Sequence, residues 1–286
     1  GAEESYCIEA LMQDGKALQA GTSHFVGQNF AKASEIEYQS REGRNEYAWT
    51  TSWGVSTRLI GGMIMTHADD DGMIMPPRLA PQHVVLLPLI KKEEEREQIM
   101  AYVESVAASL RALRFHERDV EVRIDKRDLS PGEKGWGWVK KGIPVRVEVG
   151  MRELENDALF VAWRDADKKE AQPRGEFIDG FIERLDQMQQ TLLDRALQFR
   201  DTHTKEIDEY ADFERFFTPE NKKQPEAHGG FAYSHWCGGA ACEEKINKAL
   251  AVTIRLIPFD RTADSDATCI LCSKKSLGRV VFAKSY

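Results

Sequence analysis

The sequence contains no long apolar run, no basic leader and no internal repeat. None of its segments approaches the roughly 20 apolar residues that a membrane-spanning helix needs, which predicts a protein without a membrane anchor. The first residues also lack the basic and apolar regions of a secretory signal. We therefore expect a cytoplasmic protein whose five cysteines are thiols or metal ligands.

Basic residues are in the minority. The chain has 39 Lys and Arg against 47 Asp and Glu, a net charge of −8, which argues mildly against a nucleic-acid-binding protein. Local clusters of Lys and Arg can nevertheless hold a phosphate backbone on an acidic protein. With 42% hydrophobic and 30% charged residues, the 286-residue chain is globular, and its length predicts two or three domains.

Strand signals dominate the first 80 residues. Alternating apolar residues flank Asp14-Gly15, a pair typical of a hairpin turn. Pro76, Pro77 and Pro81 mark the end of this block. The expected elements are strands at 6–12 and 16–25, a helix at 29–34, a strand at 46–52 and an apolar helix at 57–66.

Strands and helices alternate in the second block, which predicts βαβ units and a mostly parallel sheet. Its expected elements are strands at 84–89, 120–124, 144–149 and 159–163, and a helix at 93–114. The next helix, at 176–200, is too long for a simple crossover and should lead to a third block from about residue 204. That block carries four of the five cysteines and ends in a strand at 279–285.

Four cysteines in the third block form two close pairs. Cys237 and Cys242 are followed, after 26 intervening residues, by Cys269 and Cys272. Two short loops of this kind can wrap one tetrahedral zinc ion, and a site with four protein ligands is structural rather than catalytic. The alternative is four unrelated buried thiols. Cys7 stands alone on a strand and is expected to be a core residue.

Polar side chains recur on the second expected strand and on the segment before the helix at 57–66. Gln19, Thr22 and His24 form the first cluster, although His24 could also be a hydrogen-bonded core histidine. In the second cluster, Gly54 allows a ligand to approach the backbone and Arg58 stands at the start of the helix. A cation beside the positive end of a helix dipole predicts an anion site, with a surface salt bridge as the alternative.

Several runs resemble prolyl-tRNA synthetase, a class II enzyme, in its archaeal and eukaryote-like type. The first run spans 16–32, and the second spans 51–81 and is similar to motif 3 of the family. Residues 138–149 resemble the family's anticodon-binding domain, and the four cysteines match its C-terminal zinc domain. The resemblance covers essentially the whole chain.

The resemblance implies an α/β and α+β multidomain fold. Residues 1–82 would be the C-terminal part of the antiparallel class II catalytic sheet, including motif 3. Residues 83–190 would form an α/β anticodon-binding domain, and residues 191–286 a small α+β zinc-binding domain. The family also implies a homodimer.

The implied activity is ATP-dependent activation of L-proline to prolyl-adenylate, followed by transfer to the 3′ end of tRNA(Pro). ATP and Mg²⁺ would serve catalysis, and Zn²⁺ would be structural. Such chemistry requires positioning and charge neutralisation more than a protein nucleophile. The sequence accordingly shows no pairing of a nucleophile with a base.

The resemblance also implies roles for particular residues. The ATP-binding positions are Gln19, Thr22, Ser56 and Arg58, and the proline-binding positions are His24, Ser52, Trp53 and Gly54. Arg146, Lys140 and Lys141 would contact tRNA, with Arg123 as a further candidate for phosphate, and Cys237, Cys242, Cys269 and Cys272 would bind the metal. Tyr286 matches a terminal tyrosine of the family, whereas Val139 replaces an anticodon-reading glutamate.

Motifs 1 and 2 of the class have no counterpart in the sequence, and the chain starts with Gly1 rather than Met. Two interpretations follow: a fragment of a longer enzyme, or a non-catalytic tRNA-binding or regulatory relative. We expect a fragment, because the retained ATP and proline positions would otherwise have no evident use.

Overall fold

The computed structural model describes residues 1–219, 228–259 and 266–286. By its internal contacts the chain divides into two compact units, one made of residues 1–66 and 198–286 and the other of residues 67–197. The sequence-based domain limits at 82 and 190 stay predictions. No helix in the described ranges combines the length and the apolar composition needed to cross a membrane.

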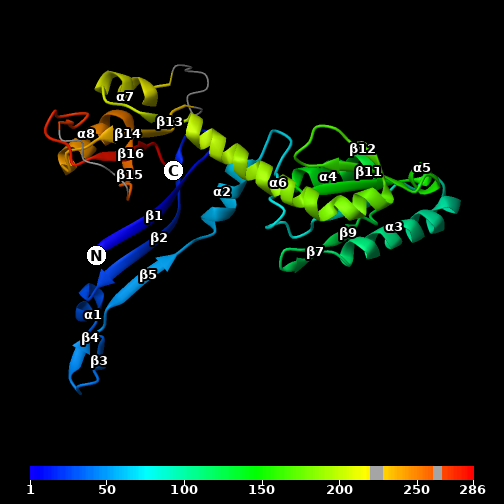
Figure 1. Cartoon of the computed structure of the whole chain (residues 1–286), viewed down its shortest axis with the longest axis horizontal. Coiled ribbons are helices and arrows are strands. Elements are labelled where there is room, and N and C mark those ends of the chain that lie inside the picture. Colours follow the sequence, from blue (N-terminus) through cyan, green and yellow to red (C-terminus); the bar gives the residue numbers. More distant parts are fainter. Residues whose placement is uncertain (220–227, 260–265) are drawn as a thin grey trace. The chain divides into compact units, whose positions relative to one another are not determined.

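The first unit begins with an antiparallel sheet in the order β1-β2-β5 (Figure 1). Its strands are β1 (Glu4–Leu11), β2 (Ala17–Gly27) and β5 (Thr50–Gly54). The predicted hairpin is confirmed, with Gly15 in the turn at a φ of +77°. A Cβ added at Gly15 would lie 2.7 Å from the carbonyl oxygen of His228, so the turn requires glycine for both conformation and space.

Two short strands and two helices complete the first 66 residues. The predicted helices are present as α1 (Asn29–Ala33) and α2 (Arg58–His67). The prediction of a single strand at 46–52 is wrong in one respect. The structure divides this segment into two strands, β4 (Asn45–Tyr47) and β5. β4 pairs with β3 (Glu37–Gln39), and the chain then turns at Ala48, whose N–H donates to the carbonyl of Ile36 at 3.1 Å.

The C-terminal part of the same unit is a mixed sheet covered by helices. Its order is β13-β14-β16-β15, and Phe213, Phe217, Ile246 and Phe282 are buried in its core. Leu11 and Ala17 at the hairpin end pack against its other face in a cluster with Phe231, Val281 and Ala283. The elements are β13 (Thr204–Glu206), α7 (Tyr210–Phe217), β14 (Phe231–His235), α8 (Ala240–Leu250), β15 (Thr253–Leu256) and β16 (Arg279–Ala283).

The second unit is built on a sheet in the order β12-β11-β10-β6-β9. Its strands are β6 (Val84–Pro88), β9 (Val122–Ile124), β10 (Val145–Val149), β11 (Ala158–Trp163) and β12 (Glu170–Pro173). β9, β6 and β10 are parallel, as expected, but β11 and β12 run antiparallel to their neighbours. The tight connection from α5 (Met151–Glu155) to β11 reverses the chain without a crossover helix, so the expectation of a mostly parallel sheet holds only for one half.

Helices cover both faces of this sheet, which explains the uninterrupted apolar run in β6. Val84 and Leu86 face the core formed with α3 (Arg96–Arg111) and α6 (Arg174–Thr202). Val85 and Leu87 face α4 (Pro131–Lys140) and pack with its residue Trp138. A strand that is buried on both faces has no solvent-facing positions, so polar and apolar residues do not alternate along it. The short elements η1 (Glu93–Glu95), β7 (Arg114–Phe115) and β8 (Arg118–Asp119) flank α3.

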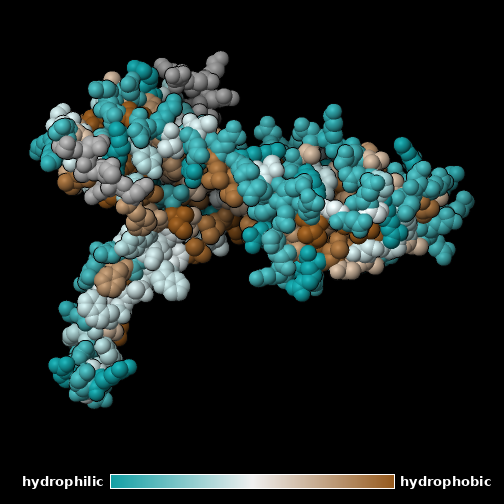
Figure 2. All heavy atoms as spheres, viewed as in Figure 1, coloured by the Kyte–Doolittle hydropathy of each residue, from teal (hydrophilic) through white to brown (hydrophobic). Residues whose placement is uncertain are grey.

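The segment after α2 belongs to the second unit. Arg164, only 9% exposed, holds it by donating to Asp69 Oδ2 at 2.7 Å and to the carbonyl of Met73 at 3.1 Å. The N–H of Met75 donates to the carbonyl of Gly142 at 3.0 Å. The surface that the second unit presents in Figure 2 is mainly hydrophilic, whereas its apolar residues are concentrated in the core.

Candidate functional site

A β-bulge decides which side chains share a face of the sheet β1-β2-β5. Ile8 pairs with Gly21 but Glu9 pairs with Gln19, so Ala20 is an extra residue in β2. Side chains of paired residues point to the same face, and a bulge shifts the alternation by one. Gln19 therefore lies on the face that carries Thr22 and His24, although strict alternation would place it on the opposite one.

The same face continues onto β5. His24 pairs with Ser52, and Thr22 pairs with Gly54, so these four positions lie side by side across two strands. His24 is half-buried, and its Nδ1 is 2.8 Å from the hydroxyl of Ser5. The structure thus brings together two expected ATP positions and three expected proline positions in one row, with Gln19 at its end.

Trp53 does not share this row. It pairs with Ser23, so its side chain belongs to the opposite face, where it is 76% exposed. On that face Phe25 stacks on Trp49 with ring centroids 5.8 Å apart. The residue that sequence analysis placed in the wall of the proline pocket is therefore separated from His24 and Ser52 by the thickness of the sheet.

Arg58 begins α2, as the sequence predicted. Its backbone N–H donates to the hydroxyl of Ser56 at 3.3 Å, which fixes the turn between β5 and the helix. The Arg58 side chain is exposed, and it forms no ion pair with any residue in the described ranges. A cation at the positive end of a helix dipole that lacks a carboxylate partner is available for an anionic ligand.

Two residues near Gln19 were missed by sequence reasoning. The amide of Gln19 donates to Glu9 Oε1 at 3.3 Å, and Glu9 accepts from Arg255 of β15 at 3.0 and 3.2 Å. Nothing in the local sequence could pair positions 9 and 255, because the contact depends on how the C-terminal sheet packs on the hairpin. Tyr286 also returns to the hairpin, where its hydroxyl donates to Asp14 at 2.5 Å.

Arg146 lies on β10 beneath α4. Its Nη1 donates to the carbonyl of Gly135 at 3.3 Å, while its Nε is buried without a hydrogen-bond partner. Burial lowers the pKa of this guanidinium from its ordinary value, and the positive charge of Arg164 acts in the same direction. A half-buried cation with unused donors is suited to bind an acceptor-rich ligand such as a guanine edge.

The two expected lysines lie at the end of α4, against tryptophan rings. The ammonium of Lys140 is 5.8 Å from the ring centre of Trp136, and that of Lys141 is 5.0 Å from the ring centre of Trp138. Trp136 is 47% exposed and was not singled out from the sequence. Trp138 is buried, but a cation beside an exposed aromatic ring, as Lys140 is beside Trp136, is typical of surfaces that bind unpaired nucleotides. Val139, by contrast, is buried at 6% exposure, so this position offers a ligand neither a polar group nor access.

A groove of about 750 Å³ adjoins Lys141 in the second unit. Within the described part of the chain, Arg111, Arg123 and Lys141 line it without forming ion pairs. Asp125 lies at its base, where Arg127 and the indole N–H of Trp138 both donate to its carboxylate. The hydrogen bonds from Arg127 lower the pKa of Asp125 well below its usual range, despite the opposing effect of burial.

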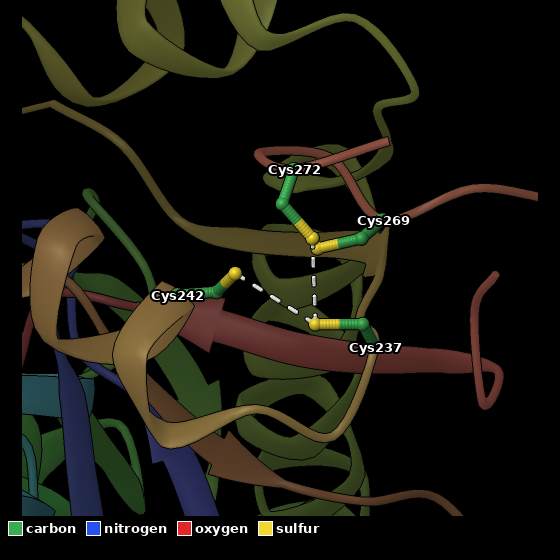
Figure 3. A group of neighbouring side chains, drawn as sticks. All are labelled: Cys237, Cys242, Cys269 and Cys272. Carbon is green, nitrogen blue, oxygen red and sulfur yellow. Dashed lines mark hydrogen bonds between the residues drawn. The ribbon is translucent and has the colours of Figure 1, made fainter. Parts of the chain in front are cut away.

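The four paired cysteines converge on one point (Figure 3). Cys237 follows β14, Cys242 belongs to α8, and the other two lie in a tight turn before β16. All four sulfur atoms lie within 4.8 Å of one another. The Sγ of Cys237 is 3.7 Å from that of Cys242 and 3.6 Å from that of Cys272. Tetrahedral zinc–thiolate bonds of about 2.3 Å place sulfurs roughly 3.8 Å apart, so the cluster has the geometry of a metal site.

The thiols of the cluster differ in their acidity. Burial, together with hydrogen bonds from its neighbours, raises the pKa of Cys242 to about 12. A backbone hydrogen bond at Lys274 lowers the pKa of Cys272 to about 7. A bound divalent cation would favour the thiolate form of all four. Cys7 lies far from the cluster in sequence and is half-buried rather than fully buried, with its Sγ 3.5 Å from the carbonyl of Arg255.

Two family models match the chain. A model described as the C-terminal domain of prolyl-tRNA synthetase matches residues 219–286, and one described as an anticodon-binding domain matches residues 83–184. The first of these includes all four clustered cysteines, and the second includes α4 and β10.

Similar proteins and structures cover the whole chain. It is 49% identical to proline–tRNA ligase 2 of Anaeromyxobacter dehalogenans and 49% identical to the proline–tRNA ligase of Bdellovibrio bacteriovorus. A structure of Cryptosporidium parvum prolyl-tRNA synthetase with halofuginone and AMPPNP is similar with a TM-score of 0.84 and 32% identity. A second structure of that enzyme, with L-proline and AMP, has a TM-score of 0.81 and 30% identity. The chain spans 57% and 56% of the two ligases and 58% and 57% of the two solved chains.

Proposed function

We propose that this chain, which belongs to the prolyl-tRNA synthetase family and corresponds to the C-terminal part of its members, serves the synthesis of prolyl-tRNA. Proline's carboxylate would attack the α-phosphate of ATP, releasing pyrophosphate and forming prolyl-adenylate. A hydroxyl of the terminal ribose of tRNA(Pro) would then attack the prolyl carbonyl and release AMP. The observation that carries the proposal is the row of polar groups across β2 and β5, ending at the helix start of Arg58.

The ATP side of the site would consist of Gln19, Thr22, Ser56 and Arg58. The exposed guanidinium of Arg58, supported by the dipole of α2, would neutralise the charge of the departing pyrophosphate. Mg²⁺ would accompany ATP, and the oxygen of Gln19 is a ligand type that this hard cation accepts. His24, Ser52 and Gly54 would border the proline. Trp53 lies on the opposite face of the sheet β1-β2-β5 and could contribute to the proline pocket only from that face.

The tRNA would be held by the second unit. Arg146 would read a base of the anticodon, and Lys140 and Lys141 would contact the backbone beside the tryptophan rings. Because Val139 is buried and apolar, anticodon reading in this chain would depend on Arg146 without help from a glutamate there.

The cysteine cluster would hold one structural Zn²⁺. Four thiolates leave no open coordination position, so the ion would stabilise the C-terminal sheet and take no part in the reaction. We further propose that the enzyme is a cytoplasmic homodimer.

The test is proline-dependent exchange between ATP and pyrophosphate, together with charging of tRNA(Pro), in the enzyme that contains this chain. The proposal expects both activities. Binding of tRNA without exchange in that enzyme would instead favour a non-catalytic tRNA-binding or regulatory protein.

A further inference from the structure

A buried ion pair joins the C-terminal sheet to β1, where Glu9 is the cross-strand partner of Gln19. The Glu9 side chain is 0% exposed and that of Arg255 is 16% exposed. Arg255 donates through Nε to Glu9 Oε2 at 3.2 Å and through Nη2 to Oε1 at 3.0 Å. The guanidinium fork therefore fixes both carboxylate oxygens.

Arg255 is itself held in place by its surroundings. Its Nη1 donates to the hydroxyl of Thr253 at 3.2 Å, and its carbonyl accepts from the thiol of Cys7 at 3.5 Å. The ion pair with Glu9 and the Cys7 contact anchor β15 to β1 on the face that also carries Thr22 and His24. The C-terminal sheet thus reaches the edge of the proposed ATP site.

The partner of Gln19 determines which end of its amide points into the site. A carboxylate bound by arginine only accepts hydrogen bonds, so only the NH₂ end of the amide can face Glu9 Oε1, at 3.3 Å. The carbonyl oxygen of Gln19 is then left for a ligand. With the carboxylate removed, the amide could rotate by half a turn and offer donors where an acceptor is required.

We propose that Glu9 and Arg255 are positioning residues for ATP, acting by fixing the amide orientation of Gln19. This inference rests on the proposed function. It extends that function by making the C-terminal sheet, through Arg255, part of the ATP site. Glu9 and Arg255 lie far apart in the sequence, and neither is among the residues that the proposed function assigns to ATP.

Breaking one partner of a buried ion pair leaves an unpaired charge and can unfold the protein. The main variant is therefore the double change Glu9→Leu with Arg255→Met, which removes both charges while keeping apolar volume. We expect its thermal unfolding to stay near that of the wild type. We expect its affinity for a non-hydrolysable ATP analogue, measured by calorimetry on the full-length enzyme, to fall about five- to tenfold, the scale of one lost hydrogen bond.

Two further variants separate positioning from simple stability. Adding Gln19→Ala to the double variant should weaken analogue binding no further, because coupled residues are not additive. Glu9→Gln combined with Arg255→Met, which leaves no unpaired charge, keeps an acceptor at position 9 but lets the amide of Gln19 rotate, and should have an intermediate effect. The control removes a more exposed pair of the same sheet, Arg279→Met with Asp208→Leu, and should leave analogue affinity unchanged.

The outcomes distinguish this inference from the proposed function. A folded double variant with wild-type affinity for the analogue, or full additivity with Gln19→Ala, overturns the role of Glu9 and Arg255. If this double variant fails to fold, Glu9→Gln combined with Arg255→Met, which also leaves no unpaired charge, decides the question by the same measurement. A wild-type enzyme that binds no analogue and shows no exchange overturns the proposed function itself.

Discussion

Single cations carry most of the chemistry proposed for this chain, because adenylate formation depends on charge neutralisation rather than on a protein nucleophile. Arg58 and Arg146 illustrate two environments for such a cation. Arg58 is exposed at a helix start, whereas Arg146 is half-buried beneath α4 with an unused Nε. The first is suited to a mobile phosphate, and the second to a fixed base edge.

For Arg58 we predict that Arg58→Ala lowers proline-dependent ATP–pyrophosphate exchange by ~10²-fold or more, the scale of removing one preorganised charge stabiliser. The assay is the exchange rate in an enzyme that contains this region. Arg41→Ala is the matched control, because Arg41 is an exposed arginine of the same unit between β3 and β4. Normal exchange in the Arg58 variant contradicts the assignment.

For Arg146 we predict that Arg146→Ala weakens the binding of tRNA(Pro) by ~1–3 kcal/mol, the range for a lost bidentate base contact, while amino-acid activation stays intact. Arg146→Lys, which keeps the charge but lacks the fork, should recover little of the loss. Titration of labelled tRNA measures both variants. An equal loss of activation and of tRNA binding would indicate misfolding instead.

At the scale of elements, the cysteine cluster joins the end of β14, the start of α8 and the turn before β16. We predict about one zinc ion per chain by metal analysis, since four thiolates make one tetrahedral site. Cys269→Ser should reduce the stability of the C-terminal sheet more than that of the sheet β1-β2-β5, because the ion contributes folding free energy to its own elements. Amide hydrogen exchange resolves the two sheets. A metal-free protein with full protection in α8 and β14 is the contrary result.

Asp125 joins β9 to α4, because it follows the strand and accepts from Trp138 at 2.8 Å. Its pKa is lowered by Arg127, so its contribution to stability is present above the unfolded pKa of about 3.9 and is lost as the pH falls toward the folded value. We predict that Asp125→Asn lowers stability at pH 7 and flattens the decline of stability below about pH 4. Denaturant unfolding at a series of pH values measures this. An unchanged acid limb would show that the carboxylate is not the linking group.

At the scale of the whole molecule, the relatives are longer than the chain, which spans 57% of the A. dehalogenans ligase. No residue of this sequence is assigned to the α-phosphate or to the proline imine. We predict that these 286 residues alone bind tRNA(Pro) but do not catalyse exchange. The lack of a group at the α-phosphate and of one at the proline imine should each add several kcal/mol to the barrier. Exchange and tRNA affinity are measured on this chain and on a version extended with an N-terminal segment. Robust exchange by the chain alone would contradict the prediction.

Local patterns in the sequence were sufficient for several elements. The hairpin around Gly15, the helix beginning at Arg58 and the long helix α6 were all predicted, because turn residues and apolar periodicity act within a few positions. The cysteine spacing likewise predicted a cluster, and the structure brings the four sulfur atoms together. The resemblance to prolyl-tRNA synthetase was recognisable because the motifs that carry it are long and contiguous.

Other features depended on contacts between distant segments. The bulge at Ala20 moves Gln19 to the face of Thr22, and no local pattern signals that extra residue. The antiparallel strands β11 and β12, the half-buried state of Cys7 and the pairing of Glu9 with Arg255 are of the same kind. The sequence by itself determined the hairpin, the helix that begins at Arg58 and the long helix α6, and it carries the motifs that resemble prolyl-tRNA synthetase. Only the tertiary structure decided which side chains share a face, because register and burial are set by the partner strand.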